Sequence, residues 1–467
     1  MTAARPDLTL VSAPLQAGAL PGGLCPSLST LTLGTHLRAA GAGVRVFDPS
    51  VEMMSPADLD TTAERLLEDH PRLLGLTALS PIEARYGAAL ARVVKQRAPE
   101  VPVVMGGIWA TARPEALLAR CPSIDGVVVG PGERSVRALA EHGLRLPDAV
   151  PGLVRRDRAG YAHTAPDRET PAPAPLDLSL LAAPDRYDIF CWLTSRGCPF
   201  DCDFCTERLG SPTFRDDPLE KVLSDTRLIA ERQGRWYLWL CDPLFGAHRG
   251  RLTEVCDALR GAGAKFLAES RVDVLSPDDV PAMAAAGCNL IYFGLESATG
   301  SSLRTLGKLD GRPSRLTRYR DGARALVAAC LDAGILPVLG VLNPVPGDTP
   351  TDLDETLAFC RELAALGHGR ADGLGPFFHA FPLRLDPGAP YERRLSDLAA
   401  LGAEWSTPAD PLFGDRFLTR ASPTVGPDEG EAFRQTIRAL NPTALGVTQR
   451  LLRSFPRPYV DIGEVLA

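Results

Sequence analysis

Two blocks of alternating β-rich and helix-length segments constrain the fold of this 467-residue chain more than any other feature. In the first block, residues 1 to about 145, amphipathic stretches separate five short apolar runs: "LTLVSA", "VRVFDP", "LLGLTAL", "VPVVMGG" and "IDGVVVG". Strands joined in this way pair in parallel and form a doubly wound α/β sheet. Because ligands of such sheets bind beyond the carboxyl ends of the strands, we look for chemistry in the loops that start at Ser12, Thr77, Gly106 and Gly130.

The second block begins at Asp188 and contains six β-rich runs: "IFCWLTS", "WYLWLC", "KFLAES", "NLIYFG", "LPVLGVL" and "GPFFHAF". A helical stretch follows each of the first five, which predicts a partial (β/α)6 barrel with its active site at the carboxyl ends of the strands. We therefore expect a Rossmann-like domain over residues 1–148, a Pro- and Ala-rich linker over 149–185, the partial barrel over 186–386, and a small, mainly helical cap over 387–467.

Charge and composition exclude several classes of protein. The formal net charge of -7 provides no basic surface of the kind that binds nucleic acid. Hydrophobic residues make up 45% and charged residues 23% of the chain, which is typical of a globular protein. No apolar run is long enough to span a bilayer, and the start "MTAARPDLTLV" has no secretory signal pattern. We expect a cytoplasmic enzyme that binds neither nucleic acid nor membrane.

Most of the 11 cysteines are scattered through apolar sequence. Isolated cysteines in such a context behave as small buried side chains, and we expect no disulfide among them. The residues concerned are Cys25, Cys121, Cys191, Cys256, Cys288, Cys330 and Cys360.

Three other cysteines come after the first strand of the second block at the spacing C-x3-C-x2-C: Cys198, Cys202 and Cys205. Four thiolates close a tetrahedral zinc site or fully ligate an iron–sulfur cluster, whereas three leave one metal position open. An open position implies a ligand from outside the protein. Zinc with a distant fourth ligand remains the alternative at this point.

This loop and the later strand ends, over about residues 186 to 385, resemble the radical S-adenosylmethionine (SAM) superfamily. The resemblance implies that the three cysteines hold a [4Fe-4S] cluster, which makes them the catalytic and metal-binding residues, and that SAM binds the fourth iron through its amino and carboxylate groups. One electron from the reduced cluster would then cleave SAM to methionine and a 5′-deoxyadenosyl radical.

The same resemblance implies SAM contacts at the strand ends in "WLCDPLFG", "LAESRVD", "YFGLES" and "LNPVPGD". A carboxylate and a hydroxyl suit a ribose or an amino group, and a guanidinium suits a carboxylate. Asp242 departs from the Gly-Gly-Glu form that is usual after the second strand. The expected cofactor-binding residues of the barrel are Phe204, Asp242, Glu269, Ser270, Arg271, Gly294, Glu296, Ser297 and Asn343.

A doubly wound block in front of such a barrel resembles the cobalamin-dependent radical SAM subclass. The run "GGIWATARPEALLARCPSIDGVVVGPGE" and the loop "TALSPIE" carry this resemblance, since glycines let the backbone approach a flat macrocycle. The residues expected to bind cobalamin are Thr77, Leu79, Ser80, Gly106, Gly107, Ile108, Trp109, Gly130, Gly132 and Glu133.

The chain lacks the Asp-x-His-x-x-Gly loop with which cobalamin-dependent mutases ligate cobalt. His36 falls inside a predicted helix, where we expect a core or surface histidine. Cobalt would therefore have no protein histidine on its lower face. A vestigial domain that holds no cofactor is the alternative.

The subclass mostly methylates carbon or phosphorus centres, so the resemblance implies a C-methyltransferase that acts on an unactivated carbon in natural-product biosynthesis. One SAM would give a methyl group to cob(I)alamin, and a second SAM would give the deoxyadenosyl radical that abstracts a substrate hydrogen. The substrate radical would then take the methyl group from methylcobalamin. The implied partners are a small-molecule or peptide substrate, held between the domains, and an external one-electron reductant of flavodoxin or ferredoxin type.

Three alternative functions stay open. The first is a cobalamin-dependent radical SAM enzyme that performs a cyclisation, rearrangement or ring contraction without methyl transfer. The second is a methylthiotransferase, but this needs a second cluster in the first domain, and only Cys25 and Cys121 precede residue 150. The third is a cobalamin-binding sensor without catalysis, against which the intact three-cysteine loop argues.

Overall fold

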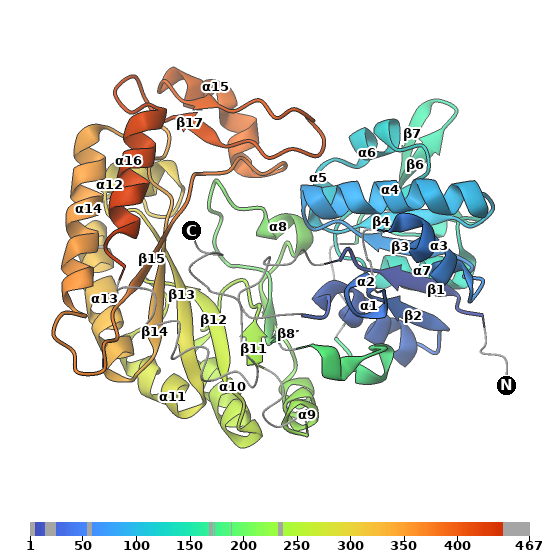
Figure 1. The fold of residues 1–467 in the computed structure, drawn as a ribbon, viewed down its shortest axis with the longest axis horizontal. Coiled ribbons are helices and arrows are strands. Elements are labelled where there is room, and N and C mark those ends of the chain that lie inside the picture. The colour runs from blue at the N-terminus through green and yellow to red at the C-terminus, as the bar shows by residue number, and fades with distance from the viewer. Residues whose placement is uncertain are drawn as a thin grey trace.

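The computed structural model describes residues 5–14, 25–53, 58–167, 171, 173–187, 189–231 and 237–441. Two α/β units lie side by side, each built on its own parallel sheet (Figure 1). The last part of the expected cap, residues 442–467, lies outside the described residues. Among the helices described, none has both the length and the apolar character needed to cross a membrane.

The sheet of the front domain has the strand order β2-β1-β3-β4-β5-β6-β7, and its first five strands are parallel. Each of the five predicted runs contains one of these strands, so the doubly wound prediction is confirmed. The order reverses between β1 and β3, the point at which such sheets bind ligands. The strands are β1 (Leu8–Val11), β2 (Val44–Phe47), β3 (Leu74–Thr77), β4 (Val103–Gly106) and β5 (Gly126–Val128).

Helices cover both faces of this sheet. On one face α1 (Leu28–Ala39) packs on α7 (Glu133–His142), and α3 (Leu59–Leu67) packs on α4 (Pro81–Arg97). Polar side chains cap the amino-terminal ends of the helices, as when Ser27 accepts the backbone N–H of Thr30. The helices are α1 (Leu28–Ala39), α2 (Pro49–Glu52), α3 (Leu59–Leu67), α4 (Pro81–Arg97), α5 (Ile108–Ala112), α6 (Pro114–Arg120) and α7 (Glu133–His142).

The start of the expected linker is not a linker. Residues 153–163 form an antiparallel hairpin, β6 (Leu153–Asp157) and β7 (Gly160–His163), that extends the front sheet beyond β5. Leu153 and Val154 are buried against the sheet, and Gly160, with φ +125°, begins β7 directly after the two-residue turn. The linker prediction was wrong here because the Pro- and Ala-rich composition starts only after the hairpin.

The second domain is an open, fully parallel sheet in the order β15-β14-β13-β12-β11-β8. Helices cover its outer face, and every predicted run contains one strand, which confirms the partial barrel (Figure 1). The strands are β8 (Ile189–Trp192), β11 (Tyr237–Leu240), β12 (Phe266–Arg271), β13 (Cys288–Glu296), β14 (Leu336–Val341) and β15 (Phe377–Ala380). The helices are α9 (Leu219–Ala230), α10 (Arg249–Ala262), α11 (Val280–Ala285), α12 (Gly300–Thr305), α13 (Pro313–Asp332) and α14 (Pro350–Ala365).

The C-terminal region connects the two domains as well as covering the barrel. Leu412 belongs to the buried apolar core of the front domain, and Phe413 packs against it. Glu392 forms an ion pair with Arg113 of the front domain. The described elements of this region are α15 (Leu395–Ala400), β16 (Glu404–Trp405), β17 (Leu418–Arg420) and α16 (Pro427–Arg438), so it contains a short strand pair as well as the expected helices.

The end of α16 protects the open edge of the barrel sheet. Asn441 accepts the backbone N–H of Phe378 at 2.6 Å and donates to the carbonyl of the same residue at 3.0 Å. One side chain thus satisfies both backbone groups of Phe378 at the free edge of β15, and Arg438 donates to the carbonyl of Ala380.

Replacing Asn441 by Ala is expected to leave both groups of Phe378 without these partners, at a cost of about 1–3 kcal/mol. Hydrogen exchange measured by mass spectrometry should become faster in the peptide that contains β15. Gln435→Ala, an exposed position on the same helix, is the control and should leave the exchange unchanged. Equal exchange in the two variants would contradict the assigned role of Asn441.

Candidate active site

The three cysteines lie on the loop after β8, at the carboxyl end of the barrel sheet. Gly197 starts the loop with φ +69°, and a Cβ there would meet the carbonyl oxygen of Thr213 at 2.4 Å. Asp203, inside the motif, donates its backbone N–H to Leu306 and forms an ion pair with Arg394 of the C-terminal region. Groups distant in sequence therefore fix the loop.

The thiols of Cys198, Cys202 and Cys205 are free. Arg271 Nη1 donates to Cys202 Sγ at 3.5 Å, and the backbone N–H of Glu207 donates to Cys205 Sγ at 3.5 Å. Exclusion of water by the surrounding protein raises the pKa of all three thiols, that of Cys205 to about 12. Deprotonation therefore needs the positive charge of a bound metal group, and N–H donors toward sulfur are a common feature of iron–sulfur sites.

Within the described part of the chain, no three Cys, His, Asp or Glu side chains are arranged to hold a single metal ion, and this includes the three cysteines of the loop.

Two polar groups at the end of β12 are already engaged by the protein. Arg271 pairs with Asp273 at 2.8 Å and lies over the ring of Phe200, 3.8 Å from its centre. Ser270 Oγ donates to the carbonyl of Phe245 at 2.8 Å. Arg271 thus contacts the cysteine loop at Cys202 and Phe200, and its contact with a SAM carboxylate stays a prediction.

Two carboxylates lie near the same edge of the sheet. Glu269 accepts from Trp239 Nε1 at 3.0 Å, and burial raises the pKa of Glu269. Glu296 follows Gly294 at the end of β13 with φ +63° and pairs with Lys308 at 3.2 Å. A Cβ on Gly294 would lie 2.4 Å from Glu296 Oε1, so a glycine is needed to seat this carboxylate.

Ser297 and Asn343 lie deeper in the barrel. Ser297 Oγ is 3.2 Å from the hydroxyl of Thr356, and Asn343 Nδ2 donates to Asp348 at 2.6 Å. Asn343 Oδ1 is buried and has no hydrogen-bond partner among the described residues. Asn343 therefore keeps an acceptor for a bound group, whereas Ser297 is occupied.

Asp242 is fully engaged in positioning the start of the cysteine loop. Its carboxylate accepts the backbone N–H of Thr194 at 2.6 Å, the backbone N–H of Ser195 at 3.0 Å and the hydroxyl of Thr194. Burial raises the pKa of Asp242 to about 6, against the effect of these donors. These bonds give Asp242 a role in holding the start of the loop, and its assignment as a cofactor-binding residue stays a prediction.

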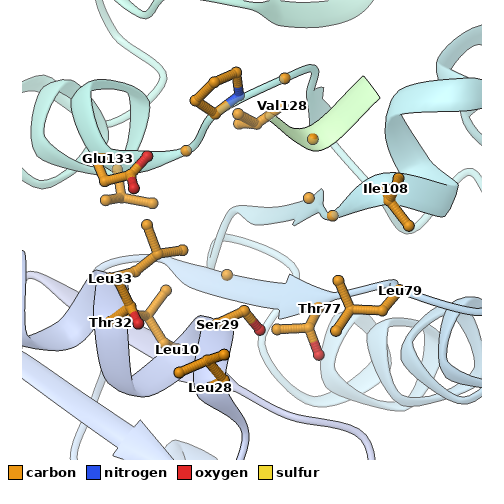
Figure 2. A pocket seen from close by; sticks show the side chains of 18 of the residues that line it. Leu10, Leu28, Ser29, Thr32, Leu33, Thr77, Leu79, Ile108, Val128 and Glu133 are labelled. Carbon is orange, nitrogen blue, oxygen red and sulfur yellow. The ribbon is translucent and has the colours of Figure 1, made fainter. Parts of the chain in front are cut away.

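A cavity of about 470 Å³ with a mainly apolar wall lies over the front sheet, between α1 and α7, and extends to the carboxyl ends of the strands. Figure 2 shows side chains from both helices and from the strand ends around it. The sequence-predicted residues that line it are Thr77, Leu79, Gly106, Gly107, Ile108, Gly130, Gly132 and Glu133.

Two residues expected in this site do not line the cavity. Ser80 caps α4 by accepting the backbone N–H of Glu83 at 3.2 Å. Trp109 is 6% exposed and belongs to the apolar core of the front domain. Both residues are next to lining residues in the sequence. The side chain of Ser80 points to the backbone of α4, and that of Trp109 points into the apolar core, so neither faces the cavity.

The glycines of the site have different roles. Gly107 has φ +113°, and a Cβ there would meet the carbonyl oxygen of Ala78 at 2.6 Å, so the backbone itself requires glycine. A Cβ on Gly106 would meet nothing closer than Val128 at 3.8 Å. The space beside Gly106 is therefore room for a ligand, which fits a bulky cofactor such as cobalamin.

The cavity wall also contains residues that the sequence analysis missed. Leu28, Ser29 and Thr32 of α1 line it, as do Arg196 and Glu207 of the cysteine loop. Burial, and then the charge of Glu269, raise the pKa of Glu207 to about 7. The run "CPSLSTLTL" has an ordinary helix pattern, so only the packing of α1 over the sheet reveals its part in the site. His36 lies elsewhere, in a surface depression with Arg134 and Arg137.

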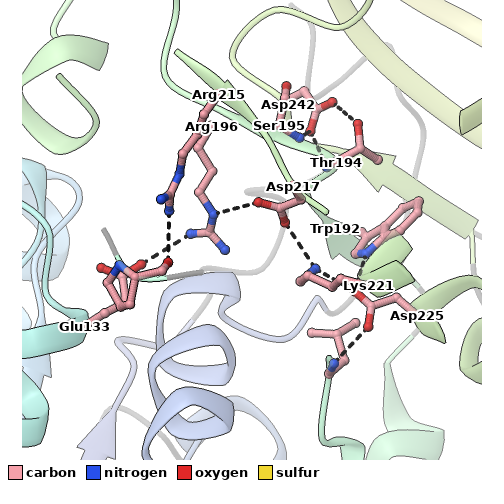
Figure 3. Close-up of polar contacts among 12 residues, drawn as sticks. Glu133, Trp192, Thr194, Ser195, Arg196, Arg215, Asp217, Lys221, Asp225 and Asp242 are labelled. Atoms are coloured by element: carbon pink, nitrogen blue, oxygen red, sulfur yellow. Dashed lines mark hydrogen bonds and ion pairs between the residues drawn. The ribbon is translucent and has the colours of Figure 1, made fainter. Parts of the chain in front are cut away.

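A chain of ion pairs joins the cavity to the cysteine loop (Figure 3). Arg196, two residues before Cys198, donates to Glu133 of the front domain at 3.4 Å and to Asp217 of the barrel at 3.2 Å. The side chain of Arg196 is 12% exposed and that of Asp217 is fully buried, and Lys221 lies 3.2 Å from Asp217. Because Glu133 lines the cavity, this chain fixes the cavity relative to the cysteines.

Comparisons with known proteins agree with this arrangement. Residues 17–140 match the family model of the B12 binding domain, and residues 192–360 match that of the radical SAM superfamily. Fold and site thus define a radical SAM enzyme with an amino-terminal cobalamin-binding domain. The chain belongs to the cobalamin-dependent radical SAM enzymes, and the cofactors that its two domains imply are a [4Fe-4S] cluster, SAM and cobalamin.

Three curated proteins illustrate the similarity. An uncharacterized methyltransferase of Pyrococcus horikoshii is 29% identical over 57% of this chain and 60% of its own length. An anaerobic magnesium-protoporphyrin IX monomethyl ester cyclase of Rubrivivax gelatinosus is 25% identical over 74% of this chain and 63% of its own length. The cobalamin-dependent radical SAM methyltransferase TokK of Streptomyces tokunonensis is 33% identical over 40% of this chain and 29% of its own length. The chain thus spans less than two thirds of each of these relatives.

Two solved structures have the same fold. The radical SAM methyltransferase TsrM from Kitasatospora setae superposes with a TM-score of 0.71 at 20% identity, over 94% of this chain and 89% of that chain. The cobalamin-dependent SAM radical enzyme OxsB superposes with a TM-score of 0.72 at 20% identity, over 92% of this chain and 66% of that chain. At these identities the likeness concerns the fold.

Replacing Arg196 by Gln is expected to destabilise the protein strongly. The change removes the cation between Glu133 and the buried Asp217, and breaking a buried pair in this way costs about 3–5 kcal/mol. Because Lys221 still faces Asp217, we expect the lower end of this range. Denaturant unfolding followed by circular dichroism measures the loss.

Arg208→Gln is the matched control for Arg196. Arg208 pairs with Asp201, and these two side chains are 50% and 70% exposed, so the expected loss is below about 1 kcal/mol. Equal losses in the two variants would contradict a special role for Arg196.

Proposed function

We propose that this protein is a methyltransferase that adds a methyl group to an unactivated carbon of a small molecule or peptide in natural-product biosynthesis. The observation that carries the proposal is the composition of the cavity wall. Gly106 and Ile108 of the front domain form one part, and Leu193, Arg196 and Glu207 at the cysteine loop form another. A group bound in the cavity therefore meets the cysteine loop directly.

The cysteine loop and the cavity are the proposed sites of two different cofactors. Cys198, Cys202 and Cys205 are the proposed ligands of the [4Fe-4S] cluster, and the residues of the cavity are the proposed contacts of cobalamin. When bound, the cluster and SAM supply a carbon radical that removes a substrate hydrogen atom, and cobalamin supplies the methyl group.

The residues of the chain bind and orient these groups. Glu269, Glu296 and Asn343 keep acceptor atoms at the strand ends and are the proposed partners of SAM. Asp242 and Arg271 hold the cysteine loop in place. The carboxylate of Glu207, with a pKa of about 7 through burial and the nearby Glu269, is able to hold a proton at the boundary between the cavity and the loop.

The relatives support methyl transfer as the reaction. The similar proteins of Pyrococcus horikoshii and Streptomyces tokunonensis are both named as methyltransferases. The proposed reaction also needs one electron from an external donor of flavodoxin or ferredoxin type. We place it in the cytoplasm, where reducing conditions favour free thiols.

A cyclase that transfers no methyl group is the second candidate. The observation in its favour is the similarity to the magnesium-protoporphyrin IX monomethyl ester cyclase, which extends over 74% of this chain. Loss of a methyl group from SAM leaves S-adenosylhomocysteine, whereas cleavage by the cluster leaves 5′-deoxyadenosine. The two functions therefore differ in what they make from SAM.

We expect the holoenzyme, given SAM and a low-potential reductant, to form both S-adenosylhomocysteine and 5′-deoxyadenosine, quantified by liquid chromatography and mass spectrometry. Protein reconstituted without cobalamin is the control and should form 5′-deoxyadenosine alone. Absence of S-adenosylhomocysteine from the complete enzyme would reject methyl transfer in favour of the cyclase.

Metal analysis after anaerobic purification with cobalamin tests the cysteine assignment. We expect about four irons per chain, as a [4Fe-4S] cluster requires, together with cobalt. Replacing Cys198, Cys202 and Cys205 by Ala should remove the iron and sulfide and leave the cobalt. Cys121→Ala, in the front domain, is the control; iron that survives in the triple variant would show that the ligands lie elsewhere.

Gly106→Leu tests the cavity assignment. The new side chain occupies space that the protein leaves open beside Gly106, so cobalamin binding should weaken by about 1–3 kcal/mol, the usual cost of overpacking. Titration with hydroxocobalamin measures this change, and the iron content should stay the same. Gly261→Leu, an exposed position on α10 with open space around it, is the control. Unchanged cobalamin affinity in Gly106→Leu would place the cofactor elsewhere.

A further inference from the structure

A second group of cysteines lies at the boundary between the two domains, apart from the cysteine loop. Cys25 precedes α1 in the front domain, Cys191 lies in β8 of the barrel, and Cys241 comes directly after β11. The Sγ atoms of Cys25 and Cys191 are 2.9 Å apart. The sequence predicts small buried side chains without a disulfide at both positions. Both residues are free thiols, Cys25 is buried and Cys191 is partly exposed, and packing brings the two into contact across 166 positions of sequence.

The pairing of β8 with β11 brings in the third thiol. The two strands are parallel neighbours, with Cys191 opposite Trp239, and Cys241, two residues after Trp239, is a neighbour of Cys191. The side chain of Cys25 is buried, at 5% exposed, whereas Cys191 and Cys241 are partly accessible. Two of the three residues are thus partly exposed to solvent.

The distance between Cys25 and Cys191 is short for two separate thiols. A disulfide bond measures about 2.05 Å, so the two sulfur atoms need to approach by only about 0.9 Å from their present 2.9 Å. The pair is thus close to bonding distance while both residues are free thiols.

A bond between these two residues would connect two walls of the cavity. Leu28 and Ser29 of α1 stand three and four residues after Cys25 and line the cavity, and Leu193, two residues after Cys191, lines it as well. The separation of these two parts of the cavity wall is therefore mechanically linked to the separation of Cys25 and Cys191.

We propose that Cys25 and Cys191 form a reversible disulfide that cross-links the two domains when a low-molecular-weight disulfide oxidises the protein. One cysteine loses its proton, attacks the small disulfide and releases one small thiol. The other cysteine then displaces the second half of the small disulfide as a second thiol. The two protein thiols together give up two electrons and two protons, and the small disulfide becomes two thiols. Under reducing conditions both residues stay as thiols.

The neighbouring thiols slow the reaction of the pair with an oxidant. The hydrogen bond with Cys241, that with Cys25 and burial all raise the pKa of Cys191. Because the thiolate is the attacking form, exchange at neutral pH is slower than at an exposed cysteine. The disulfide thus forms under sustained oxidation, and not in brief contact with an oxidant.

The test uses the anaerobically purified holoenzyme, incubated with cystamine and then blocked with iodoacetamide under denaturing conditions. Digestion without reduction and mass spectrometry should find the peptide of Cys25 joined to that of Cys191, lighter by two hydrogens than the two thiol peptides and separated again by dithiothreitol. Cys121, a buried front-domain cysteine, is the internal control and should be recovered in alkylated form. Recovery of both Cys25 and Cys191 as alkylated thiols, or of Cys191 joined only to Cys241, would overturn the proposal.

A second readout monitors the cavity and rests on the proposed cobalamin site. Release of bound cobalamin into a chase of labelled cobalamin should be slower in the oxidised enzyme and return to its original rate with dithiothreitol. Cys25→Ser should abolish this difference, whereas Cys121→Ser should keep it. If the linked peptide forms while the release rate stays the same, the cross-link stands and the placement of cobalamin in this cavity is wrong.

Discussion

The active site depends on one geometric constraint, which is that both sheets are parallel and each presents the carboxyl ends of its strands at a single edge. The loops after β3, β4 and β5 must therefore gather on one side of the front domain, and the loop after β8 on one side of the barrel. The cavity touches all of these loops, so the two edges meet at one place. A cofactor on one sheet and a cluster on the other are brought together by topology before any individual side chain contributes.

Buried charges then fix how the two edges meet. Arg196 lies between Glu133 of the front domain and Asp217 of the barrel, and the pair of Arg113 with Glu392 ties the front domain to the C-terminal region. Desolvation offsets much of the attraction in such pairs, so their contribution to net stability is small. Their directional bonds instead select one orientation of the domains, and apolar contacts such as that of Leu412 supply the attraction.

Local patterns in the sequence predicted the strands and the cysteine motif, whereas features that depend on long-range packing were missed. Each predicted strand is present because short apolar runs that alternate with helices pair as the parallel strands of a sheet. The cysteine motif could be recognised because its three residues lie within eight positions of sequence. The wall formed by Leu28 and Ser29 depends on how α1 crosses the sheet. The contact of Cys25 with Cys191 joins residues 166 positions apart, which no local pattern encodes. Ser80 shows the opposite kind of error. Its position beside a binding loop predicted a contact in the cobalamin site, whereas its side chain caps α4 and does not line the cavity.

Asp242 carries the most instructive departure from the expected pattern. Its carboxylate accepts hydrogen bonds from Thr194 and Ser195, the two residues that lead into the cysteine loop. A carboxylate that accepts these three bonds has little acceptor capacity left for an amino group of a ligand. This bracing fixes the start of a loop that has to hold a cluster in one position. In the function we propose, other acceptors at the strand ends recognise the SAM amino group. Glu269 and Glu296 are placed for it because, within the described part of the chain, the side chain of each accepts from a single residue, Trp239 and Lys308 respectively.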